Sequence, residues 1–360
     1  MNRPSMMNRP SMNRPIANRP RILTGDRATG PLHLGHLAGS LANRVRLQHE
    51  YDTLILIADV QALTTHFERP EGIAAGVRAL ALDYLAAGID PEVATIVVQS
   101  LVPAIAELTV FFSMLVTVNA LRHNPTIKTE AAEHGYSDLT YGFLGYPVSQ
   151  AADIAFCRAE LVPVGEDQLP HIELARKVIR RFNELYPGPE GPALIEPRGL
   201  LGSVPRLVGL DGRAKMSKSL GNSIDLADPP EVIREKVGRA VTDPSRARAT
   251  DPGHPEVCAV FAYRRAFQPA DALNDAEGAC RGGRVGCVEC KRAMAELLIE
   301  RLAPSRERRA YYQAKPRLIT DILMAGTARA RRLGDETMAA VRRAMSLDHF
   351  PLEGAPPTLL

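Results

Sequence analysis

Two histidines, His33 and His36, lie three residues apart in the sequence, and Gly35 lies between them. An apolar run over 21–25 precedes them and an amphipathic run over 37–51 follows, which predicts a strand, a turn and a helix. A helix N-terminus offers unpaired N–H groups and a positive dipole end to an anion. The imidazoles add donors, and the glycine leaves room for a flat group. The motif therefore favours polyphosphate binding, although a plain helix cap explains the histidines equally well.

A second motif, Lys-Met-Ser-Lys-Ser at 215–219, lies about 180 residues further along the chain. Two lysines and two serines on one loop suit a phosphate charge that shifts during a reaction, whereas either lysine alone would be an ordinary surface residue. The two motifs in this order resemble the paired signatures of class I aminoacyl-tRNA synthetases. A third stretch, 165–174, resembles the tryptophanyl branch of that family. The resemblance runs from about residue 22 to about residue 347, nearly the whole chain.

The resemblance implies a reaction in which an amino-acid carboxylate attacks the α-phosphate of ATP and releases pyrophosphate. No protein nucleophile is needed, so catalysis is positioning and electrostatic stabilisation, and Mg²⁺ is expected with the ATP. The catalytic residues it implies are His33, His36, Lys215, Lys218 and Lys128, the last being a surface lysine on the alternative interpretation. The ATP-binding residues it implies are Arg27, Thr29, Gly35, His36, Gly165, Glu166, Asp167, Leu207, Lys215, Met216, Ser217, Lys218 and Ser219.

An amino-acid pocket is expected on one helix face, because Tyr146, Gln150 and Asp153 follow the spacing i, i+4, i+7. By resemblance, Asp153 accepts the indole N–H of tryptophan, while Tyr146 and Gln168 hold the ammonium group. Two positions depart from the usual bacterial tryptophanyl pattern: Gln150 replaces a methionine that packs on the indole, and Arg27 replaces a glutamine. The tryptophan-binding residues expected are Leu23, Tyr146, Gln150, Asp153, Val164 and Gln168.

The choice between tryptophan and tyrosine depends on the first strand. The Tyr-x3-Gln-x2-Asp spacing also occurs in tyrosyl-tRNA synthetases, which place a tyrosine on that strand to bind the substrate hydroxyl. Here the matching residue is Leu23, which cannot form a hydrogen bond through its side chain. A polar mismatch of this kind discriminates strongly, so tryptophan is favoured. A tyrosine–tRNA ligase and a tRNA-binding or protein-binding paralogue with weakened charging remain the alternatives.

Four of the five cysteines, Cys258, Cys280, Cys287 and Cys290, form the pattern C-x21-C-x6-C-x2-C. Some tryptophanyl enzymes carry a nearly identical set that holds a [4Fe–4S] cluster. Four thiolates suit an iron–sulfur cluster or zinc, and unligated thiols are the alternative. Cys157 lies on an apolar helix face and is expected in the core.

Composition bounds the remaining possibilities. The chain has 360 residues, 45% of them hydrophobic and 24% charged, enough for two domains with a sizeable core. No apolar run reaches about 18 residues, the N-terminus lacks a signal-peptide core, and the odd cysteine count does not indicate a secreted disulfide framework. A cytoplasmic protein without a membrane partner is expected.

The sequence divides into three parts. Residues 1–20 repeat Asn-Arg-Pro four times and predict a disordered basic tail. Alternating strand and helix patterns predict a class I catalytic domain over 21–223, with a doubly wound parallel sheet of Rossmann type. The family places a dimer-forming insertion at about 100–150, so a homodimer is expected. Residues 224–360 predict an α-helical domain that binds the anticodon part of tRNA(Trp). Within it, residues 281–343 carry 15 lysines and arginines against 7 acidic residues, which suits a polyanion.

Overall fold

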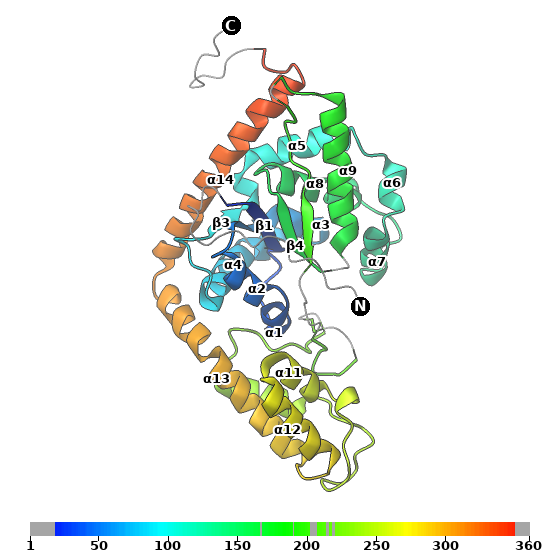
Figure 1. Ribbon diagram of the computed structural model, residues 1–360, viewed down its shortest axis with the longest axis vertical. Coiled ribbons are helices and arrows are strands. Elements are labelled where there is room, and N and C mark those ends of the chain that lie inside the picture. Colours follow the sequence, from blue (N-terminus) through cyan, green and yellow to red (C-terminus); the bar gives the residue numbers. More distant parts are fainter. Residues whose placement is uncertain are drawn as a thin grey trace.

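A five-stranded parallel sheet forms the centre of the upper lobe (Figure 1). The computed structural model describes residues 19–165, 168–189, 191–201, 207–213, 216–217 and 220–349. The strands lie in the order β3-β2-β1-β4-β5, and every neighbouring pair is parallel. Their bounds are β1 Arg21–Arg27, β2 Asp52–Ala58, β3 Thr95–Val98, β4 Leu161–Val164 and β5 Arg198–Leu201.

This strand order confirms the predicted doubly wound fold. The chain first builds outward from β1 through β2 to β3, and then returns to place β4 on the other side of β1. The direction of winding therefore changes between β1 and β4. Ligands of such sheets bind at the carboxyl ends of the strands next to this switch point.

The Pro- and Gly-rich sequence over 186–213 predicts loops, with a strand near 206–209. The structure instead has strand β5 at Arg198–Leu201. Three of its four residues are exposed, because β5 is an edge strand and carries no apolar run. Residue 206 lies outside the described part, and the described residues 207–209 form only an isolated bridge at position 208, so the strand expected near 206–209 is not found in them.

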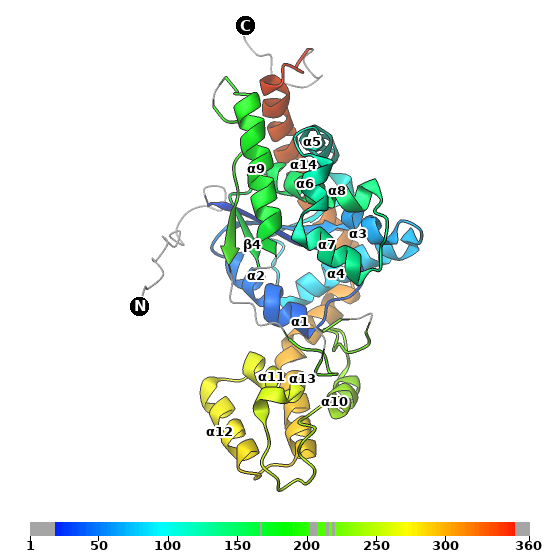
Figure 2. The same ribbon diagram turned by 90° about the vertical axis from the view of Figure 1, so that its right-hand side faces the viewer.

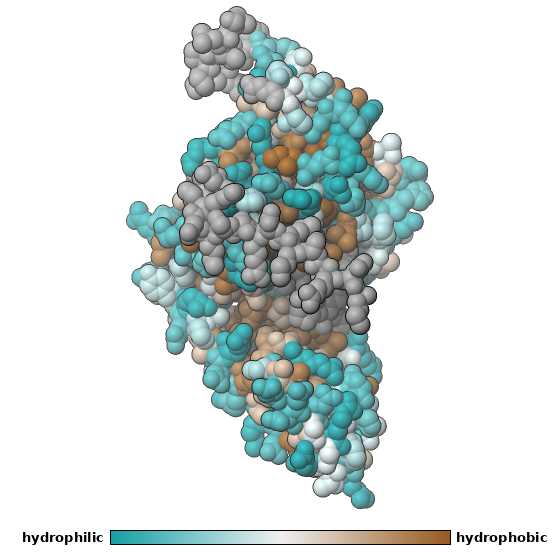
Figure 3. All heavy atoms as spheres, viewed as in Figure 1, coloured by the Kyte–Doolittle hydropathy of each residue, from teal (hydrophilic) through white to brown (hydrophobic). Residues whose placement is uncertain are grey.

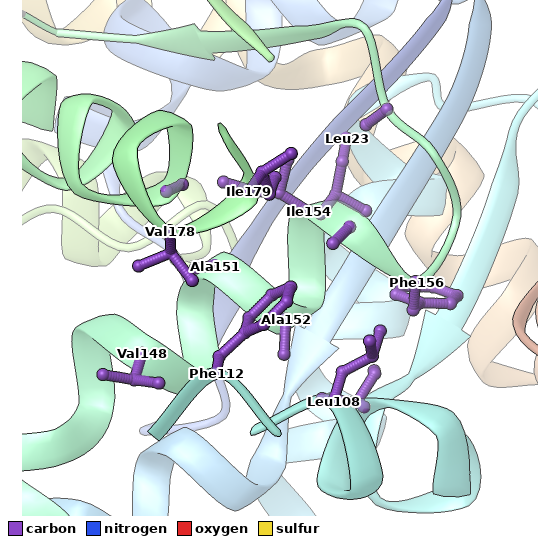
Figure 4. Packing of buried hydrophobic residues seen from close by; sticks show 14 of the residues in the cluster. Leu23, Leu108, Phe112, Val148, Ala151, Ala152, Ile154, Phe156, Val178 and Ile179 are labelled. Atoms are coloured by element: carbon purple, nitrogen blue, oxygen red, sulfur yellow. The ribbon is translucent and has the colours of Figure 1, made fainter. Parts of the chain in front are cut away.

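Helices cover both faces of the sheet. Successive side chains of β2 point to opposite faces, and all of them are buried, so both faces must be covered. Leu54 and Leu56 belong to one core with Phe112 of α5, and Ile55 belongs to a second core with Tyr84 of α4. Figure 4 shows α8 side chains packed between those of α5 and α9 in the first core. The helices of this lobe are α1 Leu34–His36, α2 Ala42–Leu47, α3 Asp59–His66, α4 Ile73–Ala87, α5 Pro103–Ser113, α6 Val118–Arg122, α7 Pro125–Glu133, α8 Tyr141–Ala155 and α9 Leu169–Leu185.

The helix expected after the histidine motif is not uniform. A five-residue π-helical segment, Leu37–Leu41, separates α1 from α2. Short π segments of this kind occur frequently at functional sites. The sequence over 70–88, with proline at its start and glycine at its end, predicts the next helix. That helix, α4, ends before Gly88, whose φ of 109° favours glycine.

The C-terminal helices form a second, lower lobe and a long connection back to the sheet (Figures 1 and 2). The lower lobe contains α10, α11, α12 and the start of α13 (Figure 2), and α14 runs along the edge of the upper lobe (Figure 1). Figure 3 shows hydrophobic residues gathered at the waist between the lobes on the face in view. The bounds are α10 Pro230–Arg239, α11 Ala259–Phe267, α12 Ala270–Arg281, α13 Cys287–Gln313 and α14 Pro316–Ala344.

Helix α14 covers the open edge of β3. The N–H of Val98 donates to Oγ1 of Thr327 over 3.3 Å, so a helix side chain replaces a missing strand partner. A Cβ atom at Gly326 would lie 2.1 Å from the carbonyl oxygen of Ile96, so only glycine allows this approach. Arg329 adds a 2.8 Å ion pair to the buried Asp52 at the start of β2. The C-terminal helix is therefore part of the support of the sheet. Among the described residues, no helix is both long enough and apolar enough to cross a membrane.

Candidate active site

The histidine motif lies at the start of α1, the first helix after β1. Nδ1 of His33 accepts the N–H of Gly35 over 3.1 Å, and Nδ1 of His36 accepts the N–H of His33 over 3.2 Å. These two bonds form a capping box, and the two rings lie 3.9 Å apart. Because both Nδ1 atoms act as acceptors, a neutral ring carries its proton on Nε2. In the neutral form, each imidazole therefore carries its N–H on the ring nitrogen that takes no part in the capping box.

Residues that follow the lysine motif are hydrogen-bonded to the histidine motif. The N–H of Leu34 donates to Ile224 over 2.9 Å, and the N–H of Leu226 donates to Leu32 over 2.9 Å. A Cβ atom at Gly35 would lie 3.7 Å from the Cβ of Met216 and 2.9 Å from the His33 ring. The structure thus brings together two motifs that are far apart in the sequence.

The predicted ATP-binding residues have different surroundings. Met216 and Leu207 are buried and joined by a 3.2 Å backbone hydrogen bond, and Thr29 is exposed. Lys128 is exposed on α7. The backbone N–H of Gln168 donates to Gly165. The predicted residues Glu166, Asp167, Lys215, Lys218 and Ser219 lie outside the described residues.

A partly buried ion pair holds the end of β1. Arg44 of α2 contacts the carboxylate of Asp26 and donates to the carbonyl oxygen of Gly25 over 3.1 Å. The hydroxyl of Tyr84 donates to the same carboxylate over 2.8 Å. Burial acts to raise the pKa of Asp26, but the Arg44 guanidinium outweighs it and lowers that pKa to about 2. We did not predict these residues, although an acidic residue within a buried strand was a usable signal.

Asp153, the last α8 residue of the predicted amino-acid pocket, is 3% exposed. Its two carboxylate oxygens accept hydrogen bonds from Nε2 of Gln61 over 2.8 Å and from Nε2 of Gln99 over 2.7 Å. Burial raises the pKa of Asp153 to about 8, although the Gln99 hydrogen bond opposes the rise. Sequence reasoning missed both glutamines. Their position in the sequence could have indicated them, because each glutamine follows the carboxyl end of a buried strand.

Tyr146 lies seven residues before Asp153 on α8, and its hydroxyl is 3.0 Å from Nε2 of His171. Burial raises the pKa of Tyr146, and the neighbouring Glu130 carboxylate raises it further. Glu130 in turn lies 3.6 Å from the guanidinium of Arg27. Leu23 is buried, while Gln150, Val164 and Gln168 are partly exposed.

The four predicted metal-ligating cysteines line one cavity in the lower lobe: Cys258, Cys280, Cys287 and Cys290. Nε of Arg264 lies 3.3 Å from the Cys290 sulfur, and Nη1 of Arg246 lies 3.8 Å from the Cys287 sulfur. Within the described ranges, no group of three or more His, Cys, Asp or Glu side chains is placed so that it could hold a metal ion. Cys157 is buried in the main core, as predicted.

Comparison with known proteins identifies the family. Residues 16–303 match the family described as tRNA synthetases class I (W and Y). The chain is 48% identical over 339 residues to the tryptophan–tRNA ligase of Treponema pallidum (strain Nichols), covering 93% of this chain and 99% of that protein. The corresponding enzyme of Lactococcus lactis subsp. lactis (strain IL1403) is 44% identical over 340 residues, or 92% of this chain and 99% of that protein.

A solved structure gives the same result for the fold. The tryptophanyl-tRNA synthetase of Campylobacter jejuni, complexed with ADP and tryptophan, superposes with a TM-score of 0.80 at 28% identity. The match covers 91% of this chain and all of that chain. The sheet order, the paired motifs and these relatives together show that the chain belongs to the tryptophanyl-tRNA synthetases, within the class I tRNA synthetases.

Proposed function

We propose that the chain is a tryptophan–tRNA ligase that activates L-tryptophan with ATP and then transfers it to the 3′ end of tRNA(Trp). The observation that carries the choice of amino acid is the pocket on α8. Asp153 supplies a buried acceptor for the indole N–H, and Leu23 offers no partner for a tyrosine hydroxyl. The curated relatives in Treponema pallidum and Lactococcus lactis bear the same enzyme name.

In the activation step, a carboxylate oxygen of tryptophan attacks the α-phosphorus of ATP. The bond from that phosphorus to its bridging oxygen breaks, and pyrophosphate leaves with the bonding electrons. His33 and His36 donate Nε2–H bonds to the phosphates, and Lys215 and Lys218 stabilise the charge that develops on pyrophosphate. Mg²⁺ would accompany the ATP and would supply charge neutralisation to its phosphates. The tyrosine–tRNA ligase is not favoured, because of Leu23 and the curated relatives.

The test is ATP–pyrophosphate exchange with each of the 20 standard amino acids. Tryptophan is expected to support exchange, and tyrosine to support almost none at equal concentration. Better exchange with tyrosine would refute the tryptophanyl assignment. Absent exchange, combined with tight binding of tRNA, would favour the paralogue with weakened charging. Since aminoacylated tRNA is used by ribosomes, we also propose a cytoplasmic location.

Binding of tRNA is assigned to the lower lobe, residues 224–313 of the proposed helical domain. The basic excess of 281–343 is partly used within the protein, since Arg309 contacts Asp83 and Arg342 pairs with Glu107. Exposed arginines of the lower lobe, Arg284, Arg292 and Arg301, remain as candidates for phosphate contacts.

A homodimer is proposed through the insertion at about 100–150. Large apolar side chains are exposed in this part: Val110 of α5, Met114 directly after α5, Val118 of α6 and Tyr141 of α8, with exposed fractions of 54–76%. Glutamate in place of Met114 should bury a charge in the interface and shift the mass measured by light scattering toward the monomer. The matched control is Met324→Glu on α14, which is 54% exposed and outside this part. A dimer unchanged by Met114→Glu would contradict the proposed interface.

An iron–sulfur cluster, or failing that one zinc ion, is proposed for the four cysteines. The four side chains line one cavity, and the Arg246 and Arg264 donors beside them suit anionic sulfur. Anaerobically purified protein should carry iron and acid-labile sulfide. Replacing Cys287 and Cys290 by Ser should weaken tRNA binding while tryptophan activation is kept. Metal-free protein and normal charging by the double variant would mean that the thiols are unligated.

A further inference from the structure

The insertion helix α7 directs one carboxylate toward the amino-acid pocket. The Asn124 side chain caps the helix by accepting the N–H groups of the next turn, and Ile127 and Ala131 pack into the main core. Glu130 lies three residues after Ile127 and therefore on the same inward face. Its side chain is 21% exposed, whereas Lys128 is exposed on a different face.

Glu130 is incompletely satisfied. Its Oε1 atom pairs with the Arg27 guanidinium over 3.6 Å, and its carboxylate also interacts with the Tyr146 hydroxyl, while its buried Oε2 atom lacks a hydrogen-bond partner of ordinary geometry in the described part of the chain. A buried carboxylate oxygen without a donor is costly, and such atoms in native proteins call for a ligand or another explanation. An ammonium group provides three N–H donors and a positive charge.

The location of Glu130 matches one end of a tryptophan molecule. Glu130 neighbours Tyr146, and Asp153 lies seven residues further along α8, a rise of about 10 Å. If Asp153 binds the indole N–H, the amino and carboxyl groups of the substrate lie near Tyr146. At this end the protein offers Glu130 with a negative charge and Arg27 with a positive charge, the complement of a zwitterion.

We propose that Glu130 binds the α-ammonium group of the substrate and that Arg27, held by Glu130, faces its carboxylate. This inference rests on the proposed function. Glu130 transfers no proton, because activation leaves the ammonium group unchanged. It acts by fixing Cα, and with it the carboxylate oxygen that attacks ATP. This also explains why Arg27 replaces the glutamine usual in the family, because the arginine has an acidic partner on α7.

Ligands that lack one charge test the proposal. Tryptamine has no carboxylate, and indole-3-propionate has no ammonium group. Because the chain contains no tryptophan, the indole fluorescence of each ligand can be followed without a protein indole background. Glu130→Gln should weaken binding of tryptophan and tryptamine by about ten- to hundred-fold, the scale of one charge-assisted hydrogen bond. Binding of indole-3-propionate should stay within about twofold or improve, since a like charge is removed.

Two controls separate binding from a structural role. Glu133→Gln makes the same change at an exposed position of α7 and should leave all three affinities unaltered. Arg27→Gln should weaken indole-3-propionate but not tryptamine. If Glu130 only orients Arg27, then Arg27→Gln will reproduce the full ligand pattern of Glu130→Gln. Equal losses for all three ligands, or none, overturn the inference. Wild-type protein that fails to bind or activate tryptophan instead overturns the proposed function.

Discussion

Replacing Asp153 by Asn should make the protein more stable and less active, and the gain in stability should grow with pH. The unfolded carboxyl group loses its proton near pH 4, whereas burial raises the pKa of Asp153 in the folded state to about 8. Between these values the folded state binds more protons than the unfolded state. Stability of the wild type therefore falls as pH rises through this window, and the asparagine variant lacks this dependence.

The size of the effect follows from linkage. Each pH unit inside the window changes the free energy of unfolding by about 1.4 kcal/mol, so pH 5.5 and pH 7.5 differ by up to about 3 kcal/mol. Water entry and relaxation reduce this figure, and half of it is a reasonable expectation. Comparing one variant at two pH values cancels the contributions to stability that do not depend on pH. An example is the mismatch of an asparagine amide with Gln61 or Gln99.

The assay is thermal unfolding of the wild type and the variant at both pH values, with the exposed Asp275→Asn as control. The Tm of Asp153→Asn relative to wild type should rise by about 3 °C or more from pH 5.5 to pH 7.5, taking roughly 2 °C per kcal/mol. Pyrophosphate exchange at pH 7.5 should show a KM for tryptophan raised about tenfold or more, with the KM for ATP nearly unchanged. A Tm difference independent of pH would refute the burial argument, and an unchanged KM would remove Asp153 from the indole site.

Two further changes test other parts of the site. Arg44→Met should leave Asp26 without its partner and cost about 3–5 kcal/mol in denaturant unfolding, while adding Asp26→Asn should recover much of that loss; equal stabilities of wild type and Arg44→Met would contradict a stabilising role. Lys218→Ala should slow adenylate formation by about 10²-fold in single-turnover kinetics without weakening tryptophan binding, and a wild-type rate would make this lysine an ordinary surface residue.

The fold was largely predictable because its strongest signals are local. All residues of β2 and β3 are buried, and each strand therefore contains an apolar run that is visible in the sequence. The paired motifs also gave the family from sequence alone. The edge strand β5 could not be found in this way, since its residues are mostly exposed and its strand character comes from pairing with β4.

The missed residues of the site share a different property. Gln61, Gln99 and Glu130 are polar residues on three separate elements, and nothing in their local sequence distinguishes them from surface residues. Their roles arise only when the fold brings them to Asp153 or Tyr146. The same holds for α14, whose contact with β3 joins residues more than 200 positions apart.

The two carboxylates of the proposed pocket illustrate why such neighbours matter. Asp153 is held by neutral amides, and burial raises its pKa to about 8; Glu130 lies beside the arginine Arg27. The indole N–H is neutral and needs only an oxygen acceptor, which an aspartic acid provides in either protonation state. The ammonium group is charged and binds best to an ionised carboxylate. The proposed pocket therefore places neutral amide partners around Asp153 at the indole end and the charged pair of Glu130 and Arg27 at the end that meets the charged groups of the tryptophan zwitterion.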